Sequence, residues 1–389
     1  MILAKRGGWL RALAALVTVL GTSVHAEQQP PVLPAETSDV ATLPPTGPHR
    51  VLVMAGYSAQ GANFVDADSE SLRVLGKVPV NAGGMVVWSG DGSRVYALET
   101  FYSHGNRGTR EDVLAVYDGQ TLNLLKEIIV PGRLLVDPKL ATLDTSEDGR
   151  LAYVYDMSAG VHVVDLAQGR VVTSVSLPGC ALTYPFGPRG FATVCGDGTI
   201  GTVLVPDSGS AKAVFSRPFF DANNDPVFES SVNDKSTGEA WFLSFSGRIF
   251  PVKLAAKPLI GNPWSISIAA GFPPVGTGVQ ELAWRPGAAG RVLALHRATK
   301  RLYVLMHTGN FWTHRAPGTE VWVLDAIQRQ LVRRISLEMP AASIAVSQDA
   351  NPLLYTMGAG GEFSVLDATT GAKLRQRKLP GLLAWVPGY

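Results

Sequence analysis

A repeating unit of short strands and tight turns recurs along this chain, and it limits the possible folds more than any other feature. In residues 83–130 the unit is complete: an apolar strand, a Ser-Gly-Asp-Gly turn, a second apolar strand, a third that ends in Asp118, and a fourth. Units of about 40–55 residues with four strands each are typical of propeller blades. Five further copies are visible in the sequence, which are residues 146–177, the hairpin that begins at Cys180, 226–254, 281–337 and 342–379.

Two fragments at the chain ends complete the pattern. Residues 51–78 supply the later strands of a unit but not its first, and residues 382–386 supply a first strand alone. A single blade cannot bury both of its faces, whereas stacked blades can, and closing the ring leaves only short edges. We therefore predict an all-β, seven-bladed β-propeller over residues 50–389, closed by pairing of the C-terminal strand with the first blade. A β-sandwich is the main alternative, but it holds fewer strands than this chain has.

The N-terminus reads as an export signal. Lys5, Arg6 and Arg11 precede or flank an apolar run over residues 10–20, and Val24-His25-Ala26 is a small-residue cleavage site. The run is short for a membrane anchor, which is the alternative, and no later stretch is long and apolar enough to span a membrane. We predict a signal peptide over residues 1–26, a proline-rich flexible arm over 27–49, and a mature protein in an oxidising compartment.

Composition and motifs exclude several functions. A formal net charge of +2, without a basic cluster carrying interleaved aromatics, argues against nucleic-acid binding. The chain has no nucleophile elbow, no Walker loop and no His-Glu-x-x-His sequence. His296, His307 and His314 lack the spacing of a zinc site. Turn capping explains the aspartates that end the third strands of several units, so a hydrolase with paired carboxylates has no support. Surface or loop positions explain the histidines, and we predict no metal site in this chain.

The two cysteines lie on a predicted hairpin. Cys180 and Cys195 flank a turn at Gly187-Pro188-Arg189-Gly190, and an antiparallel hairpin can place them opposite each other. Opposite positions are close enough for a disulfide, which the predicted export favours. Two buried free thiols are the alternative.

Two insertions interrupt the regular repeat of strands and turns. Residues 100–112 and 306–320 each join the second and third strands of their units, so both should emerge on the same face. Aromatic and arginine side chains on exposed loops suit a protein interface, and ordinary loop decoration is the alternative. The residues that we predict to contact a partner are Phe101, Tyr102, Arg107, Phe311 and Trp312.

Several motifs in order resemble one protein family. The segments are TFYSHGNRGTREDVLAVYD at 100–118, the cysteine hairpin with Cys-Gly-Asp-Gly over 180–204, Trp-Arg-Pro-Gly at 284–287, Leu-His-Arg-Ala at 295–298 and Val-Trp-Val-Leu-Asp at 321–325. They resemble the large subunit of quinoprotein amine dehydrogenases, which oxidise methylamine or aromatic amines. The resemblance runs from about residue 50 onward. One departure is the Ala-Ala-Gly after Gly287, where relatives place an aromatic residue.

The resemblance implies a function for the chain. Members of this family are seven-bladed propellers that form periplasmic heterotetramers of two large and two small subunits. The small subunit carries tryptophan tryptophylquinone and the catalytic base, so the resemblance implies that this chain has no catalytic residue and no cofactor of its own. This chain would then hold the small subunit and shape the channel for a primary amine, which the complex oxidises to an aldehyde and ammonia. Electrons would leave to a small copper protein or a cytochrome.

One residue is implied for the substrate channel. The family has an aromatic residue about seven positions before a Phe-Val pair, and Tyr57 lies at that position ahead of Phe64-Val65. A loop tyrosine without a function is the alternative there. For the whole chain, the alternative is a periplasmic propeller that acts only as a scaffold or binding protein.

Overall fold

The computed structural model describes residues 42–54, 61–80, 84–132, 134, 139–158, 160–379, 381 and 383–387. Residues 41–389 form one compact unit. The predicted signal peptide, most of the predicted arm and Tyr57 lie outside the described residues. Regular structure is almost entirely β, and α1 (Ile266–Ala269) is the single helix in the described ranges. No helix in those ranges has the length and apolar character needed to cross a membrane.

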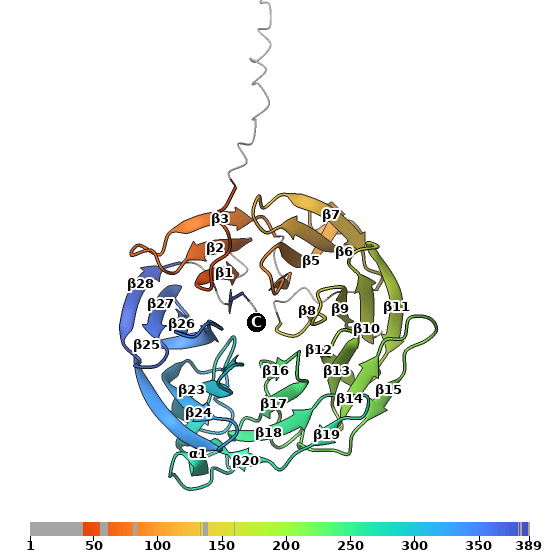
Figure 1. Cartoon of the computed structure of the whole chain (residues 1–389). Coiled ribbons are helices and arrows are strands. Elements are labelled where there is room, and N and C mark those ends of the chain that lie inside the picture. The colour runs from red at the N-terminus through yellow and green to blue at the C-terminus, as the bar shows by residue number, and fades with distance from the viewer. Residues whose placement is uncertain are drawn as a thin grey trace, which may run out of the picture. The chain divides into compact units, whose positions relative to one another are not determined.

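The described strands form six sheets around a central axis, which is an all-β propeller (Figure 1). The first sheet joins the chain ends: β29 (Leu383–Trp385), β1 (Arg50–Met54), β2 (Ala62–Asp66) and β3 (Val74–Val78). The second is β4 (Val86–Trp88), β5 (Arg94–His104), β6 (Arg107–Asp118) and β7 (Leu124–Ile129). The third is β8 (Leu143–Thr145), β9 (Leu151–Asp156), β10 (Gly160–Asp165) and β11 (Arg170–Ser176).

The other three sheets lie in the second half of the chain. The fourth is β12 (Cys180–Phe186), β13 (Gly190–Cys195), β14 (Ile200–Leu204) and β15 (Ala213–Phe215). The fifth is β16 (Val232–Asp234), β17 (Glu239–Leu243), β18 (Arg248–Lys253), β19 (Leu259–Ile260) and β20 (Trp264–Ser265). The sixth is β21 (Ala283–Pro286), β22 (Leu293–His296), β23 (Arg301–Gly309), β24 (Gly318–Asp325), β25 (Gln330–Val346), β26 (Leu353–Gly358), β27 (Glu362–Asp367) and β28 (Lys373–Lys378).

Strand position explains the burial pattern. Strands inside a sheet, such as β10, are buried along their whole length, because neighbouring sheets cover both of their faces. Outer strands such as β11 alternate between exposed residues and residues that are half-buried or, at Val175, buried, because only one face meets the next sheet. The apolar runs that marked the repeats in the sequence are therefore the middle strands of the sheets.

The recurring turns share one hydrogen-bond pattern. A serine hydroxyl donates to the aspartate two residues later, at 2.7 Å from Ser89 to Asp91 and 2.6 Å from Ser146 to Asp148. The predicted capping role of the aspartates after third strands is confirmed at Asp118, whose carboxylate accepts the backbone N–H groups of Gln120 and Thr121 at 2.9 Å. These hydrogen bonds lower the pKa of Asp118, as expected for a carboxylate that backbone amides stabilise in its charged form.

One long strand departs from the predicted units. We expected residues 281–337 and 342–379 to form separate sheets, but β25 runs through both of them. Its first part pairs with β24, where Val321 lies opposite Ile335, and its last part pairs with β26, where Ala345 lies opposite Tyr355. The change of partner falls next to Pro340, which has no backbone N–H to donate. The register with β24 shifts between Ser336 and Ala341, and Ala341 also lies opposite Gly358 of β26, so one strand links the two sets.

The first and last strands of the propeller lie side by side. β29 pairs antiparallel with β1, and Trp385 is opposite Leu52. The described part of the predicted arm, residues 42–49, belongs to the same compact unit as the strands. Leu43 is buried there, and its backbone N–H donates to the carbonyl of Gln120 at 2.9 Å.

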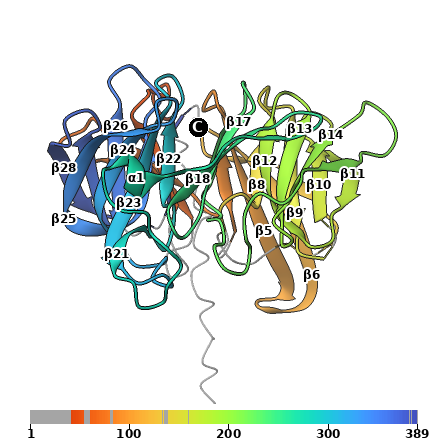
Figure 2. The ribbon, with the colours of Figure 1, turned by 90° about the horizontal axis from the view of Figure 1, so that it is seen from below.

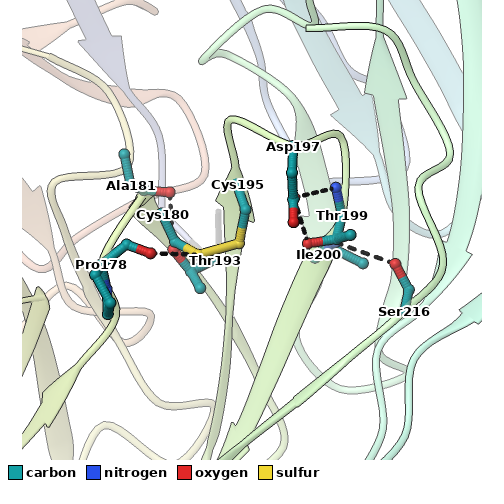
Figure 3. The surroundings of a disulfide bond; sticks show 9 residues. All are labelled: Pro178, Cys180, Ala181, Thr193, Cys195, Asp197, Thr199, Ile200 and Ser216. Atoms are coloured by element: carbon teal, nitrogen blue, oxygen red, sulfur yellow. Dashed lines mark hydrogen bonds between the residues drawn. A yellow bond between two sulfur atoms is a disulfide. The ribbon is translucent and has the colours of Figure 1, made fainter.

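The predicted disulfide is confirmed between Cys180 on β12 and Cys195 on β13 (Figure 3). A β-bulge makes their register possible. Near the turn Tyr184 pairs with Ala192, and that register alone would place Cys195 opposite Ala181. Leu182, with φ of 72°, and the residue after it together face one residue of β13, which brings Cys180 opposite Cys195. The matching position of the two cysteines therefore depends on the bulge as well as on the turn.

Candidate functional face

The β5–β6 hairpin projects beyond its sheet. On one side β4 pairs with β5 only as far as Ala97, and on the other side β7 pairs with β6 only from Val113 onward. Residues 99–112 therefore form a two-stranded ribbon that extends past the neighbouring strands (Figure 2). Phe101, 39% exposed, lies on this ribbon, as do half-buried Tyr102 and exposed Arg107.

Polar contacts fix the base of the ribbon. The Arg110 guanidinium donates through Nε and Nη2 to the two oxygens of Asp112, both at 2.8 Å, and through Nη2 to the carbonyl of Leu134 at 2.8 Å. Hydrogen bonding to Asp112 raises the pKa of Arg110, although partial burial opposes the change. On the other side of the sheet, buried Tyr117 donates to Glu99 at 2.9 Å. Because an isolated two-stranded hairpin is marginally stable in water, these contacts hold the direction of the ribbon.

The loop between β23 and β24 differs from the prediction at one residue. We expected Phe311 and Trp312 to be exposed anchors, but Phe311 is 1% exposed while Trp312 is 51% exposed. Phe311 turns inward because the Arg285 guanidinium lies 5.5 Å from its ring, and it meets Trp312 edge-on at 4.8 Å between centroids. Phe311 therefore supports the loop from below, and Trp312 is its aromatic contact surface.

Arg285 is a supporting residue whose role the sequence did not reveal. Its side chain is 1% exposed and donates to three carbonyls, those of Gly276 at 2.9 Å, Gly309 at 3.2 Å and Glu281 at 3.3 Å. Burial lowers the pKa of Arg285, and the nearby carboxylates of Glu281 and Asp225 oppose that change. One guanidinium thus ties the segment before β21 to the start of the aromatic loop. Its position inside a Trp-Arg-Pro strand was the only sequence signal.

A stack of aromatic rings continues inward from Trp312. His314 stacks on Phe245 with 4.0 Å between ring centroids and 14° between planes, and Phe228 lies 4.6 Å from Phe245. Burial and the neighbouring charge of Arg315 lower the pKa of His314, so its imidazole is neutral at neutral pH and packs as an aromatic ring.

The three histidines considered in the sequence do not converge on a metal site. His296 hydrogen bonds to Thr299 at 2.7 Å, whereas His307 hydrogen bonds to Thr313 at 2.7 Å and His314 belongs to the aromatic stack. Across the part of the chain that the structure describes, no three His, Cys, Asp or Glu side chains gather as metal ligands would.

An apolar groove of about 460 Å³ adjoins the aromatic stack. Gly196, Phe245 and His314, which line it, come from the connections between second and third strands of three successive sets of strands. The β5–β6 ribbon is the same connection in its own sheet, so the groove, the ribbon and Trp312 belong to one side of the propeller. We call this side the ribbon face.

The central axis is much narrower than the groove. Its cavity measures about 60 Å³ and is bordered by Trp88, Arg291 and Trp385. An ion pair between Lys235 and Asp144, 2.5 Å apart, also borders it. This cavity has room for only a few water molecules or a similarly small ligand, so a larger partner has to bind on an outer face of the propeller. The ribbon face carries both the apolar groove and the exposed Trp312.

Almost the whole chain is similar in sequence to proteins of one known family. The family model for the methylamine dehydrogenase heavy chain (MADH) matches residues 49–382. The methylamine dehydrogenase heavy chain of Methylobacillus flagellatus is 28% identical over 371 residues, covering 91% of this chain and 90% of that protein. The heavy chain of Methylophilus methylotrophus is 29% identical over 345 residues, covering 87% and 81%. A hydrazine synthase structure from Kuenenia stuttgartiensis matches with a TM-score of 0.54 at 15% identity, over 85% of this chain and 98% of that one, which concerns the fold alone.

Proposed function

The chain belongs to the methylamine dehydrogenase heavy chain family, and on that premise we propose that it is the large subunit of a periplasmic enzyme that converts a primary amine to an aldehyde and ammonia. The match over residues 49–382 is the observation that carries this proposal. The quinone, tryptophan tryptophylquinone, would be on a small partner subunit and would accept the two electrons of the amine. The residues of this chain would bind that subunit and form part of the channel wall.

The ribbon face is the proposed binding surface for the small subunit. Exposed Arg107 on the fixed ribbon and Trp312 on the supported loop are residue types that dominate binding energy at interfaces. Exposed Phe101 is of a type enriched at interfaces. Tyr102 contributes its partly exposed ring to the same ribbon. Tyr57 is the proposed channel residue of this chain, on the basis of the family resemblance.

We also propose that the propeller has seven blades and is closed. The sixth sheet contains eight strands, twice the number of one blade, and β25 joins its two halves. Counting those halves as two blades raises six sheets to seven blades. Pairing between β29 and β1 supports closure by the chain ends.

The cellular setting is proposed from the N-terminus and the disulfide. Residues 1–26 would be removed on export, and residues 27–49 would be an arm before the propeller at 50–389. The Cys180–Cys195 disulfide fits the periplasm, where such bonds persist. The complex would contain two large and two small subunits and would pass electrons to a small copper protein or a cytochrome.

Purification of the complex tests the proposal. The tagged chain, co-expressed with the small subunit and the maturation proteins of its source, should yield a complex whose visible spectrum shows a protein-derived quinone. That complex should reduce a dye when an amine is added, and the chain alone should not. Amine oxidation by the isolated, cofactor-free chain would contradict the proposal, and a chain that never retains a small subunit would favour a scaffold.

A further inference from the structure

We propose that the apolar groove of the ribbon face receives an apolar side chain of the small subunit with an acidic residue beside it, which pairs with Arg315. This inference rests on the proposed function and adds the chemistry of the contact. It follows from the lining of the groove, from the charges at its rim and from its continuity with Trp312.

The lining suits an apolar side chain. Leu182, Val227, Phe228 and Phe245 contribute to the groove walls. The volume of about 460 Å³ lies within the range of pockets that bury small-molecule ligands, so it has room for a large side chain. Cys195, which is crosslinked to Cys180, and the bulged β12 strand form one wall. A covalent crosslink beside the groove keeps that wall in place before a partner arrives, which lowers the entropy cost of binding.

The rim charges select the occupant. Among the charged side chains that line the groove, Glu229 is paired with Lys139 at 3.1 Å, which leaves Arg315 beside a neutral His314. Arg315 is exposed and has no ion-pair partner within the described ranges. A positive rim repels an ammonium ion, so it disfavours the amine substrate as occupant. The same rim attracts a carboxylate next to the inserted side chain.

The groove and the exposed aromatic residue form one surface. Trp312 contacts Phe245 edge-on at 6.4 Å, and Phe245 carries the His314 stack at the groove wall. A partner that covers Trp312 therefore meets the groove opening. Interface anchors of this kind usually sit in pockets surrounded by residues that exclude water.

Two variants of the full complex test the inference. Ala289→Trp fills the groove from an exposed position, and Ala372→Trp places the same side chain on an exposed turn between β27 and β28. Arg315→Glu reverses the rim charge, and Lys257→Glu makes the same charge change between β18 and β19. The measured quantity is the dissociation constant of the purified large and small subunits, with melting temperatures as a check on folding.

We expect Ala289→Trp and Arg315→Glu each to weaken assembly by about tenfold or more, the Arg315→Glu effect shrinking at high salt, while both controls match the wild type. Wild-type affinity in Ala289→Trp and Arg315→Glu would overturn the groove inference and leave the proposed function standing. Absence of assembly in the wild type would overturn both. If millimolar methylammonium weakens assembly of the wild-type subunits as much as the two substitutions do, the groove binds the amine instead of a side chain of the small subunit.

Discussion

Replacing Trp385 by alanine tests whether the two ends of the chain stabilise the propeller. Trp385 lies on β29, packs against the core cluster around β1, β4 and β5, and has the Arg291 guanidinium 4.3 Å from its ring. Arg291 is buried and donates to the carbonyl of Ala384 at 2.9 Å, so the strand is held through both a ring and a backbone group.

The cost follows from these contacts. Truncating a core tryptophan costs about 3–5 kcal/mol, and we expect the lower part of that range because Trp385 is only partly buried. Losing the ring beneath Arg291 adds about 0.5–2 kcal/mol. Together these two contributions should lower the free energy of unfolding by about 3.5–6 kcal/mol. Since 1 kcal/mol shifts the melting temperature of a domain of 150–250 residues by roughly 2–4 °C, this larger propeller should lose roughly 5–10 °C.

Thermal unfolding followed by circular dichroism measures the effect, and Trp312→Ala is the control. Trp312 is 51% exposed, so its removal should change stability by only about 0.5 kcal/mol. Deleting residues 382–389 removes all of β29 and buried Val386 as well, and the protein should then aggregate or fail to fold, because the edge of β1 is left open. Equal melting temperatures for Trp385→Ala and the wild type would show that the chain ends do not stabilise the ring.

Three further predictions concern separate parts of the chain. Replacing Cys180 and Cys195 by serine should lower stability by about 3 kcal/mol, as the loop model predicts for a crosslink across 15 residues, and a reductant should destabilise the wild type but not the variant. Burial raises the pKa of Asp234, but hydrogen bonds from Lys300 and Ser236 and the charge of Lys300 outweigh it and lower that pKa to about 2. The stabilisation by ionised Asp234 is thus complete above the pKa of the unfolded chain, about 3.9, and disappears as pH falls toward 2. The difference in free energy of unfolding between wild type and Asp234→Asn should therefore shrink over that pH interval. A constant difference would refute this prediction. Tyr57→Ala should shift the preference between a short alkylamine and an arylalkylamine by roughly ten- to two-hundredfold at most without changing the melting temperature, and an unchanged preference would remove Tyr57 from the channel.

Features that depend on near neighbours in the chain were predictable. The Ser89–Asp91 turn and the Asp118 cap each involve residues two or three positions apart, so the sequence determined the strands, their turns and the all-β propeller. The disulfide could also be predicted from the sequence, because its cysteines belong to one hairpin. The bulge at Leu182 that aligns the two cysteines could not be predicted. The two long insertions were visible as interruptions of a regular repeat.

Features that depend on loops from different sheets were decided only by the tertiary structure. Phe311 is adjacent to Trp312 in sequence, yet one is buried and the other exposed, because Arg285 from another strand lies against only the first ring. The groove combines residues from three sets of strands, and no local pattern records that their loops meet. The burial of a side chain and the charge at the groove rim depend on residues that are far apart in sequence and meet only in the folded protein. The sequence alone therefore determined the propeller and its insertions, while the packed fold determined the shape and charge of the ribbon face.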